Sequence, residues 1–236
     1  MATAAPRSGR GRAVAVAVGI TALAFVVSLI GGVALAVPVL VLELDIQRPA
    51  IFLALTAAGQ VGFLAVGYAY ARRYGLTVPI RTPTARQLAI GLGGAVLAMV
   101  VATVLSVVVT VLGLLPSSVI GDAGTQDPIV YLGLAALSVV LVAPVEEFVF
   151  RGVVQGRLRQ SFGPVGAVAG SSLLFGSMHL ANYAGNPQSV VAGALLIACV
   201  GAVFGSLYER TGNLAVTIVT HATYNAVLLG IAYVGA

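Results

Sequence analysis

The 236-residue sequence has no lysine, no tryptophan and a single cysteine, and charged residues make up only 8% of it. A soluble domain normally carries about 25% charged residues, so this scarcity excludes a soluble globular protein. Hydrophobic residues make up 59% of the chain, and several apolar runs reach the roughly 18 residues that a bilayer-spanning helix needs. These runs are continuous rather than alternating, which argues against a membrane barrel. The sequence therefore predicts an all-α integral membrane protein.

The lone cysteine and the arginines narrow the functional classes further. Cys199 lies in the middle of an apolar run, so an intramolecular disulfide is excluded and we expect a buried, apolar thiol. The net charge of +5 comes from arginines beside the apolar runs, a distribution typical of membrane topology. We therefore expect the lipid bilayer as a partner and no nucleic acid.

The apolar runs and the turn residues between them predict a polytopic bundle of about seven transmembrane helices. We expect these helices at roughly residues 13–41, 49–70, 88–115, 128–159, 164–180, 190–208 and 214–234. Residues 1–127 would form about three N-terminal membrane helices without catalytic motifs. Residues 128–236 would form a catalytic core of about four helices.

Arginines mark one side of the expected bundle. Arg7, Arg10 and Arg12 precede the first helix, whereas the polar loop with Asp122 and Asp127 contains no basic residue. Since basic loops stay in the cytoplasm, we expect a multi-pass protein of the cell membrane with a cytoplasmic N-terminus. The first apolar run is longer than the core of a secretory signal, which has about 7 to 15 residues, so we expect it to remain uncleaved.

The segment EEFVFR at residues 146–151 places three charges inside an apolar run. A charged side chain at the centre of a bilayer costs about 2.5–3.5 kcal/mol, so it indicates a functional site. Glu147 and Arg151 are four residues apart, in the favourable order for an ion pair within one helix. Glu146 points about 100° away, has no partner in its own segment, and would face a cavity between the helices. The alternative is a buried salt-bridge network that contains both acids.

Two histidines and one asparagine accompany Glu146 in the expected membrane helices. Glu146 and His179 lie about 16 residues on either side of the turn SFGP, so an antiparallel hairpin places them at one depth. His221 and Asn225 are four residues apart on one helix face, and this two-donor patch suits an oxyanion or a metal. Each histidine alone would be typical of a buried core. Together the four residues predict a water-activating site with a carboxylate base, histidines that position water or metal, and an amide donor.

Three motifs occur in order: EEFVFR at 146–151, FGSMH at 175–179 and HATYN at 221–225. They match the signature EExxxR, FxxxH and HxxxN, so the sequence resembles the CPBP intramembrane proteases, a family of CAAX-processing and bacteriocin-processing enzymes. RTGNL at 210–214 also resembles the family's sequence before the last motif. The resemblance covers roughly residues 128–234 and implies a helical bundle with an intramembrane active-site cavity that is open toward the cytoplasmic half.

The resemblance implies endoproteolysis of a membrane-associated peptide or protein substrate, of which prenylated CAAX tails are the best-known example. It implies that Glu146 is the general base that activates water, with the help of His179. His221 and Asn225 would stabilise the tetrahedral oxyanion. Structural support would come from Glu147 and Arg151.

A metal cofactor is the open part of this hypothesis. Glu146, His179 and His221 would supply the two histidines and one carboxylate of a catalytic zinc site. The family is commonly labelled metalloendopeptidase, yet members are also described as metal-independent glutamate proteases. Because the zinc motif HExxH is absent from the sequence, we favour a site without metal.

Two other functions stay open at this point. A non-catalytic membrane scaffold or a bacteriocin-immunity protein would have the same fold, although the complete set of motifs argues against it. A small transporter would use Glu146 and the histidines as a proton relay, but the sequence has no inverted repeat. The identity of the substrate and the oligomeric state do not follow from the sequence.

Overall fold

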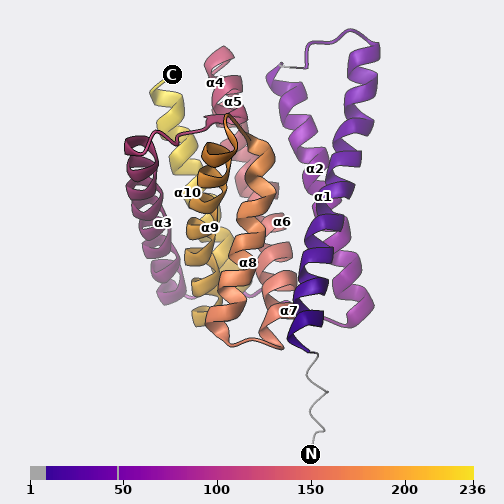
Figure 1. The fold of residues 1–236 in the computed structure, drawn as a ribbon, viewed down its shortest axis with the longest axis vertical. Helices are drawn as coiled ribbons and strands as arrows, with labels where there is room; N and C mark the ends of the chain where they lie inside the picture. Colours follow the sequence, from indigo (N-terminus) through magenta and orange to yellow (C-terminus); the bar gives the residue numbers. More distant parts are fainter. Residues whose placement is uncertain (1–8, 47) are drawn as a thin grey trace, which may run out of the picture.

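A computed structural model describes residues 9–46 and 48–236, so Arg7 lies outside the described residues. The long helices run roughly parallel to one axis, and α1 begins at one end of the bundle while α10 finishes at the other (Figure 1). The first long helices are α1 (Arg10–Val41), α2 (Pro49–Tyr74) and α3 (Ala85–Val111). The last are α8 (Pro164–Met178), α9 (Pro187–Thr211) and α10 (Leu214–Val234).

The helix that spans Ile129–Arg159 contains the EEFVFR segment and changes its hydrogen-bonding pattern along its length; we call it the motif helix. Its parts are α5 (Ile129–Leu137), the π-helix η1 (Ser138–Val142), α6 (Ala143–Glu147), the π-helix η2 (Phe148–Gln155) and α7 (Gly156–Arg159). Pro144 has no N–H to donate, and it lies at the junction of η1 and α6. Short π segments inside α-helices are frequent at functional sites, and here they flank both glutamates.

Among the described residues, six helices are long and apolar enough to cross a membrane: α1, α2, α3, the motif helix, α9 and α10. This confirms the prediction of an all-α polytopic membrane protein. Of the about seven expected helices, α8 is the short one, because its 15 residues fall below the about 20 residues of a typical span. The chain changes at His179 into the 3-10 helix η3 (His179–Asn182) and then reaches Gly185, whose φ is 134°.

A very short β ladder closes one end of the bundle. β1 (Ser117–Ser118) pairs antiparallel with β2 (Tyr183–Ala184), and α4 (Val119–Gln126) follows β1. The ladder connects the loop after α3 with the loop after α8, at the end of the bundle where α10 finishes (Figure 1).

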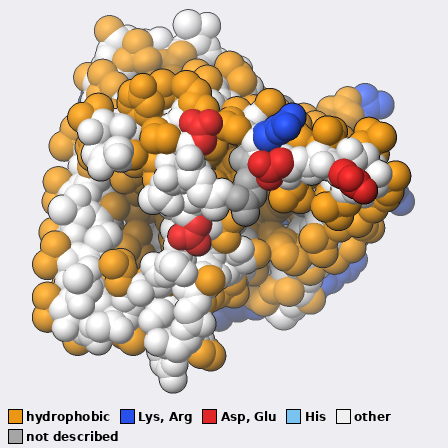
Figure 2. Space-filling view, turned by 90° about the horizontal axis from the view of Figure 1, so that it is seen from above, with side chains coloured by type: hydrophobic (Ala, Val, Ile, Leu, Met, Phe, Trp, Pro, Cys, Tyr) orange, Lys and Arg blue, Asp and Glu red, His pale blue; other side chains and the backbone are white. Residues whose placement is uncertain are grey.

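The two ends of the bundle differ in charge. Figure 2 looks onto the end where α10 finishes and shows acidic side chains with few basic ones among them. The acidic residues of the segments at this end are Glu43, Asp45, Asp122 and Asp127. The arginines of the segments at the opposite end are Arg10, Arg12, Arg72, Arg73, Arg81, Arg86, Arg157, Arg159 and Arg210. The positive-inside rule would place the arginine-rich end in the cytoplasm, and this orientation stays a prediction.

Small residues bring α2 against the motif helix. A Cβ atom on Gly67 would lie 2.8 Å from the Cγ2 atom of Val149, and a Cβ atom on Gly133 would overlap the side chain of Leu53. Glycine at both positions therefore lets the two helices approach closely. The main buried cluster of apolar side chains accordingly combines residues of α1, α2, the motif helix and α8.

The expected burial of Cys199 is wrong, because this side chain is exposed on the surface of α9. An apolar side chain in a membrane helix is equally stable against lipid and against protein, since lipid tails are as apolar as the protein core. An apolar run therefore does not reveal which of its residues are buried.

Candidate active site

Glu146 and Glu147 are adjacent in α6, yet their surroundings differ. The side chain of Glu147 is 0% exposed, whereas that of Glu146 is 12% exposed. Neighbouring residues on an α-helix point about 100° apart, so one carboxylate is directed into the packed interior and the other toward a partly open side. The two glutamates are therefore available for different tasks.

Glu147, the buried glutamate, forms an ion pair with Arg151. The ion pair that the sequence predicts is therefore confirmed. The Nε atom of Arg151 lies 3.3 Å from the Oε2 atom of Glu147, and both side chains are 0% exposed. Arg151 also donates from Nη2 to the carbonyl oxygen of Gly201 over 3.2 Å. Its guanidinium carbon lies 4.7 Å from the ring centroid of Phe175, a cation–π arrangement. Hydrogen bonding, charge and aromatic contact together hold this arginine in one position.

Gly201 on α9 is required for this arrangement. A Cβ atom at this position would lie 2.8 Å from the Phe175 ring and 3.4 Å from the Nη2 atom of Arg151. Any larger residue would therefore displace the aromatic ring or the guanidinium group from the carbonyl oxygen that accepts its hydrogen bond.

His221 on α10 lies against both glutamates. Its Nδ1 atom lies 3.0 Å from the Oε1 atom of Glu147, and its Nε2 atom lies 3.9 Å from the Oε2 atom of Glu146. An ionised carboxylate only accepts hydrogen bonds, so Nδ1 donates to Glu147 and the ring is fixed with Nε2 toward Glu146. The imidazole also stacks on the ring of Phe204, with the centroids 4.8 Å apart. The sequence analysis grouped His221 with Asn225, and its contacts with the two glutamates are additional.

Gln60 on α2 is a neighbour of Glu146 that the sequence analysis missed. Its Nε2 atom donates to the Oε1 atom of Glu146 over 3.0 Å. The sequence motifs predict no site residue within residues 1–127. A signal was present, because Gln60 is an uncharged polar residue in the middle of an apolar membrane helix, where polar side chains are uncommon and often functional.

His179 lies where α8 changes into η3. Its Nδ1 atom donates to the carbonyl oxygen of Phe175 over 2.9 Å, which leaves the ring's lone pair on Nε2. The ring of Phe175 contacts both histidine rings, with centroid distances of 4.7 Å to His179 and 6.0 Å to His221. Among the contacts of the described residues there is no hydrogen bond or ion pair between His179 and Glu146. The structure thus connects the two histidines through an aromatic side chain.

Asn225 lies one helical turn after His221 and is held by the motif helix. Its Nδ2 atom donates to the Oγ atom of Ser138 over 2.8 Å, and Ser138 is a buried residue at the start of η1. A side-chain amide has two N–H groups, so one remains for a negative charge in the site. Ser138 was also missed by the sequence analysis, because serine is too common in membrane helices to stand out.

The candidate zinc ligands do not form a metal site in this arrangement. Within residues 9–46 and 48–236, no three His, Cys, Asp or Glu side chains lie close enough together to hold a metal ion. Glu146 and His221 are neighbours, but the Nδ1 atom of His221 is engaged by Glu147. The residues as placed therefore do not fit a bound zinc ion, and we derive no step through a metal.

A second polar network fixes the arginine-rich end of the motif helix. Gln155 is buried and donates from Nε2 to the carbonyl oxygen of Gly205 over 3.1 Å and to Glu209 over 3.0 Å. The hydroxyl of Ser171 on α8 donates to the Oε1 atom of Gln155 over 3.2 Å. Glu209 also forms an ion pair of 3.0 Å with Arg159. The motif helix is therefore tied to α8 and α9 about two turns beyond the glutamates.

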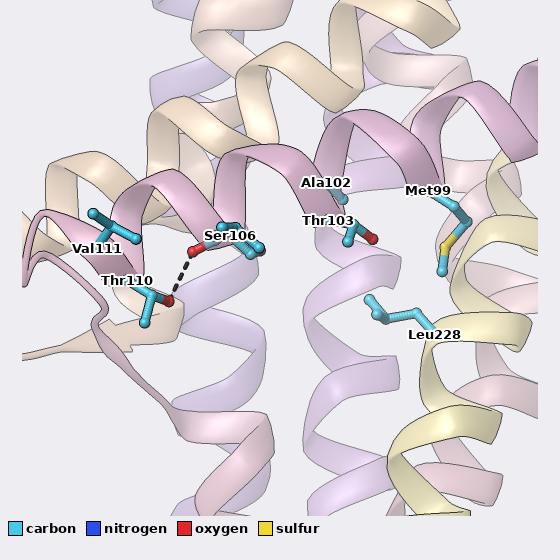
Figure 3. A pocket seen from close by; sticks show the side chains of 8 residues that line it. Met99, Ala102, Thr103, Ser106, Thr110, Val111 and Leu228 are labelled. Atoms are coloured by element: carbon cyan, nitrogen blue, oxygen red, sulfur yellow. Dashed lines mark hydrogen bonds between the residues drawn. The ribbon is translucent and has the colours of Figure 1, made fainter.

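A mostly apolar groove of about 370 Å³ lies between α3 and α10 (Figure 3). It is lined by Met99, Ala102, Thr103, Ser106, Val107, Thr110, Val111 and Leu228. The hydroxyl of Thr110 donates to the backbone carbonyl of Ser106 within α3. Since none of the residues of the three motifs lines this groove, it is separate from the candidate active site.

Comparison with known protein families gives a match over the second half of the chain. Residues 128–227 match the family model described as Rce1-like, type II CAAX prenyl endopeptidase Rce1-like. No curated protein and no solved structure matches the chain. The matched residues include the whole motif helix and all three motifs, whereas Gln60 lies outside them.

Proposed function

The chain belongs, through residues 128–227, to the Rce1-like family of type II CAAX prenyl endopeptidases, and we propose that it hydrolyses a peptide bond with a water molecule activated by Glu146. The observation that carries the proposal is the difference between the two adjacent glutamates. Glu147 is neutralised by Arg151 and bound to His221, whereas Glu146 is partly exposed. Among the residues that the structure describes, Glu146 has no cationic partner at ion-pair distance other than a protonated His221. Glu146 is therefore the carboxylate that is free to accept a proton.

The water molecule is held between Glu146 and His221. The distance of 3.9 Å between Oε2 of Glu146 and Nε2 of His221 is too long for a direct hydrogen bond and suits two groups that share a water molecule. Glu146 takes a proton from this water as the water oxygen attacks the carbonyl carbon of the substrate. When the tetrahedral intermediate collapses and the C–N bond breaks, Glu146 returns this proton to the leaving amine nitrogen. A positioned base of this kind accelerates such a step by about 10²–10⁴-fold.

The negative charge that develops on the substrate's carbonyl oxygen is stabilised by Asn225. His221 contributes from Nε2 in its doubly protonated form, because the proton on Nδ1 is donated to Glu147. Ser138 holds one N–H of the Asn225 amide, and the other N–H is available to the oxyanion. Preorganised donors of this kind contribute about 10²–10³-fold to turnover. His179, with its lone pair on Nε2, assists as a second acceptor for protons of the attacking water.

The substrate is a membrane-associated peptide or protein, and a prenylated CAAX tail is the class that the family description names. The enzyme lies in the cell membrane with its N-terminus and its arginine-rich end in the cytoplasm. The site works without a metal ion, which metal analysis of active protein tests. Stoichiometric zinc whose removal abolishes cleavage and whose return restores it would contradict this part of the proposal.

The main test compares new protein termini in whole membranes by mass spectrometry. Cells that express the native chain are compared with cells that express Glu146→Ala at the same level. We expect a set of termini that disappears with Glu146→Ala and persists with Asp122→Asn, a control that removes a carboxylate outside the site. These termini would also identify the substrate.

Identical termini in all three samples would favour the non-catalytic scaffold or immunity protein. That alternative also predicts full biological effect when both His179 and His221 are replaced. A proton-linked transporter predicts ion or solute flux that depends on Glu146 without any cleavage.

A further inference from the structure

Gln60 brings a polar group from the N-terminal helices to the base of the proposed reaction. The Nε2 atom of Gln60 lies 3.0 Å from the Oε1 atom of Glu146. An ionised carboxylate accepts hydrogen bonds only, so the amide nitrogen must face Glu146 and the amide oxygen must point elsewhere. The orientation of the Gln60 amide is thereby fixed by chemistry.

The Oε1 atom of Gln60 is buried and has no hydrogen-bond donor among the described residues. Buried acceptors in native proteins are nearly always partnered, because an unpaired buried polar atom is costly. Such an atom next to the base of an enzyme indicates a partner that arrives with the substrate. The main chain of a bound peptide offers N–H groups, which are the donors that a carbonyl oxygen accepts.

The position of Gln60 is set by the packing of α2. Leu53, Gln60 and Gly67 are seven residues apart and therefore share one face of this helix. Leu53 packs at Gly133, and Gly67 packs at Val149, so this face lies against the motif helix on both sides of Gln60. The glutamine is consequently presented to Glu146 by a rigid helix pair, which favours precise orientation.

We propose that Gln60 is a substrate-binding and base-orienting residue of the protease, a role that rests on the proposed function. Its amide N–H holds the carboxylate of Glu146 in position without neutralising it. Its carbonyl oxygen accepts a hydrogen bond from a main-chain N–H of the substrate beside the bond that is cleaved. The N-terminal helices thus contribute directly to the active site, beyond their packing role.

The first test measures cleavage of a synthetic prenylated CAAX peptide by the purified full-length protein in detergent. Gln60→Met keeps the length and approximate volume of the side chain and removes both polar atoms. We expect kcat to fall and KM to rise, with kcat/KM lower by about tenfold to a hundredfold. Thr56→Val is the control, because the Thr56 hydroxyl donates to the carbonyl of Phe52 in its own helix, and we expect native kinetics.

The second test separates the two hydrogen bonds of Gln60. Peptides in which one main-chain N–H near the cleaved bond is replaced by an ester oxygen are compared with the parent peptide. At one position the native enzyme should discriminate against the ester by about tenfold, and Gln60→Met should lose this discrimination. Gln60→Glu keeps an acceptor oxygen but loses the donor to Glu146, so it should lower kcat and retain the discrimination.

The outcomes distinguish this inference from the proposed function. If the native protein cleaves neither this peptide nor any protein in whole membranes, or if Glu146→Gln cleaves as well as the native protein, the proposed function is wrong. If the native protein cleaves, Glu146→Gln does not, and Gln60→Met has native kcat and KM, only the inference about Gln60 is overturned. Ester discrimination that is equal in the native protein and Gln60→Met also overturns it. If Gln60→Met lowers the midpoint of thermal unfolding, Gln60→Glu replaces it as the test of the inference. Ester discrimination that Gln60→Glu retains supports the inference, and discrimination that it loses overturns it.

Discussion

The carboxylates of Glu147 and Glu146 lie side by side, but they differ in burial and in the charge of the partner that binds them. Glu147 is completely buried and is compensated by a cation. Glu146 is 12% exposed and receives its hydrogen bond from a neutral amide. A guanidinium neutralises a carboxylate, whereas an amide orients it and leaves its negative charge in place. This difference favours a supporting role for Glu147 and Arg151 and agrees with the proposed role of Glu146 as the base.

The largest effect should come from breaking the buried ion pair. Arg151→Met leaves the buried Glu147 carboxylate without its guanidinium partner and with only the contact to His221, so we expect a loss of about 3–5 kcal/mol of stability. The matched control is Arg159→Met, whose partner Glu209 lies in a more exposed ion pair that should be worth at most about 1 kcal/mol. Reversible unfolding in detergent measures both variants. Equal losses would show that burial does not distinguish the two pairs.

The next largest effect should be a loss of activity without a loss of stability, in a variant of His179. His179→Ala removes a half-buried ring that packs against Phe175, and we expect kcat to fall by about 10²-fold with little change in the unfolding midpoint. His221→Ala should lower both, because His221 is buried against Glu147 and Phe204. Peptide cleavage and thermal unfolding are measured on the same samples. Native turnover by His179→Ala would remove this histidine from the mechanism.

A smaller effect should come from the group that holds Asn225. Ser138→Ala removes the acceptor of the amide, so we expect kcat to fall by about tenfold, the equivalent of one oriented hydrogen bond, with KM unchanged. Ser177→Ala is the control, because its hydroxyl donates to the carbonyl of Leu174 in its own helix. In an Asn225→Ala background, Ser138→Ala should have no further effect. An additive loss in the double variant would show that Ser138 acts independently of Asn225.

The smallest effect should come from the groove between α3 and α10. Ser106→Ala changes a residue that lines the groove and belongs to none of the three motifs, so stability should change by less than about 0.5 kcal/mol and turnover by less than about twofold. Unfolding and peptide cleavage measure the two values. A large loss of cleavage would show that the groove takes part in substrate binding.

Contacts within one helix could be predicted from the sequence, and contacts between helices mostly could not. The Glu147–Arg151 pair follows from four-residue spacing, and the structure contains it. The hydrogen bonds of Gln60 to Glu146 and of Ser138 to Asn225 connect residues 86 and 87 positions apart. Such contacts depend on how helices are rotated against each other, which hydrophobic patterns in a membrane determine weakly.

The π segments are the second reason why the site could be predicted only in part. A π turn contains about one more residue than an α turn, so each segment rotates the residues that follow it relative to a regular helix. The spacing of the motif predicts a regular helix for residues 128–159, whereas the structure places η1 and η2 on either side of α6. The faces of Ser138 and Gln155 relative to the glutamates therefore could not be deduced from spacing alone.

The shortness of α8 makes the thickness of the membrane relevant to the site. Its 15 residues span about 22 Å, less than the about 30 Å of a typical hydrocarbon core. The bilayer beside this helix must become thinner, or the polar residues after Met178 lie within the hydrocarbon core. A locally thinned leaflet would bring headgroups and water closer to His179. The acyl-chain length of the surrounding lipids should therefore affect the candidate active site, and lipids with longer acyl chains should restrict the access of water to it.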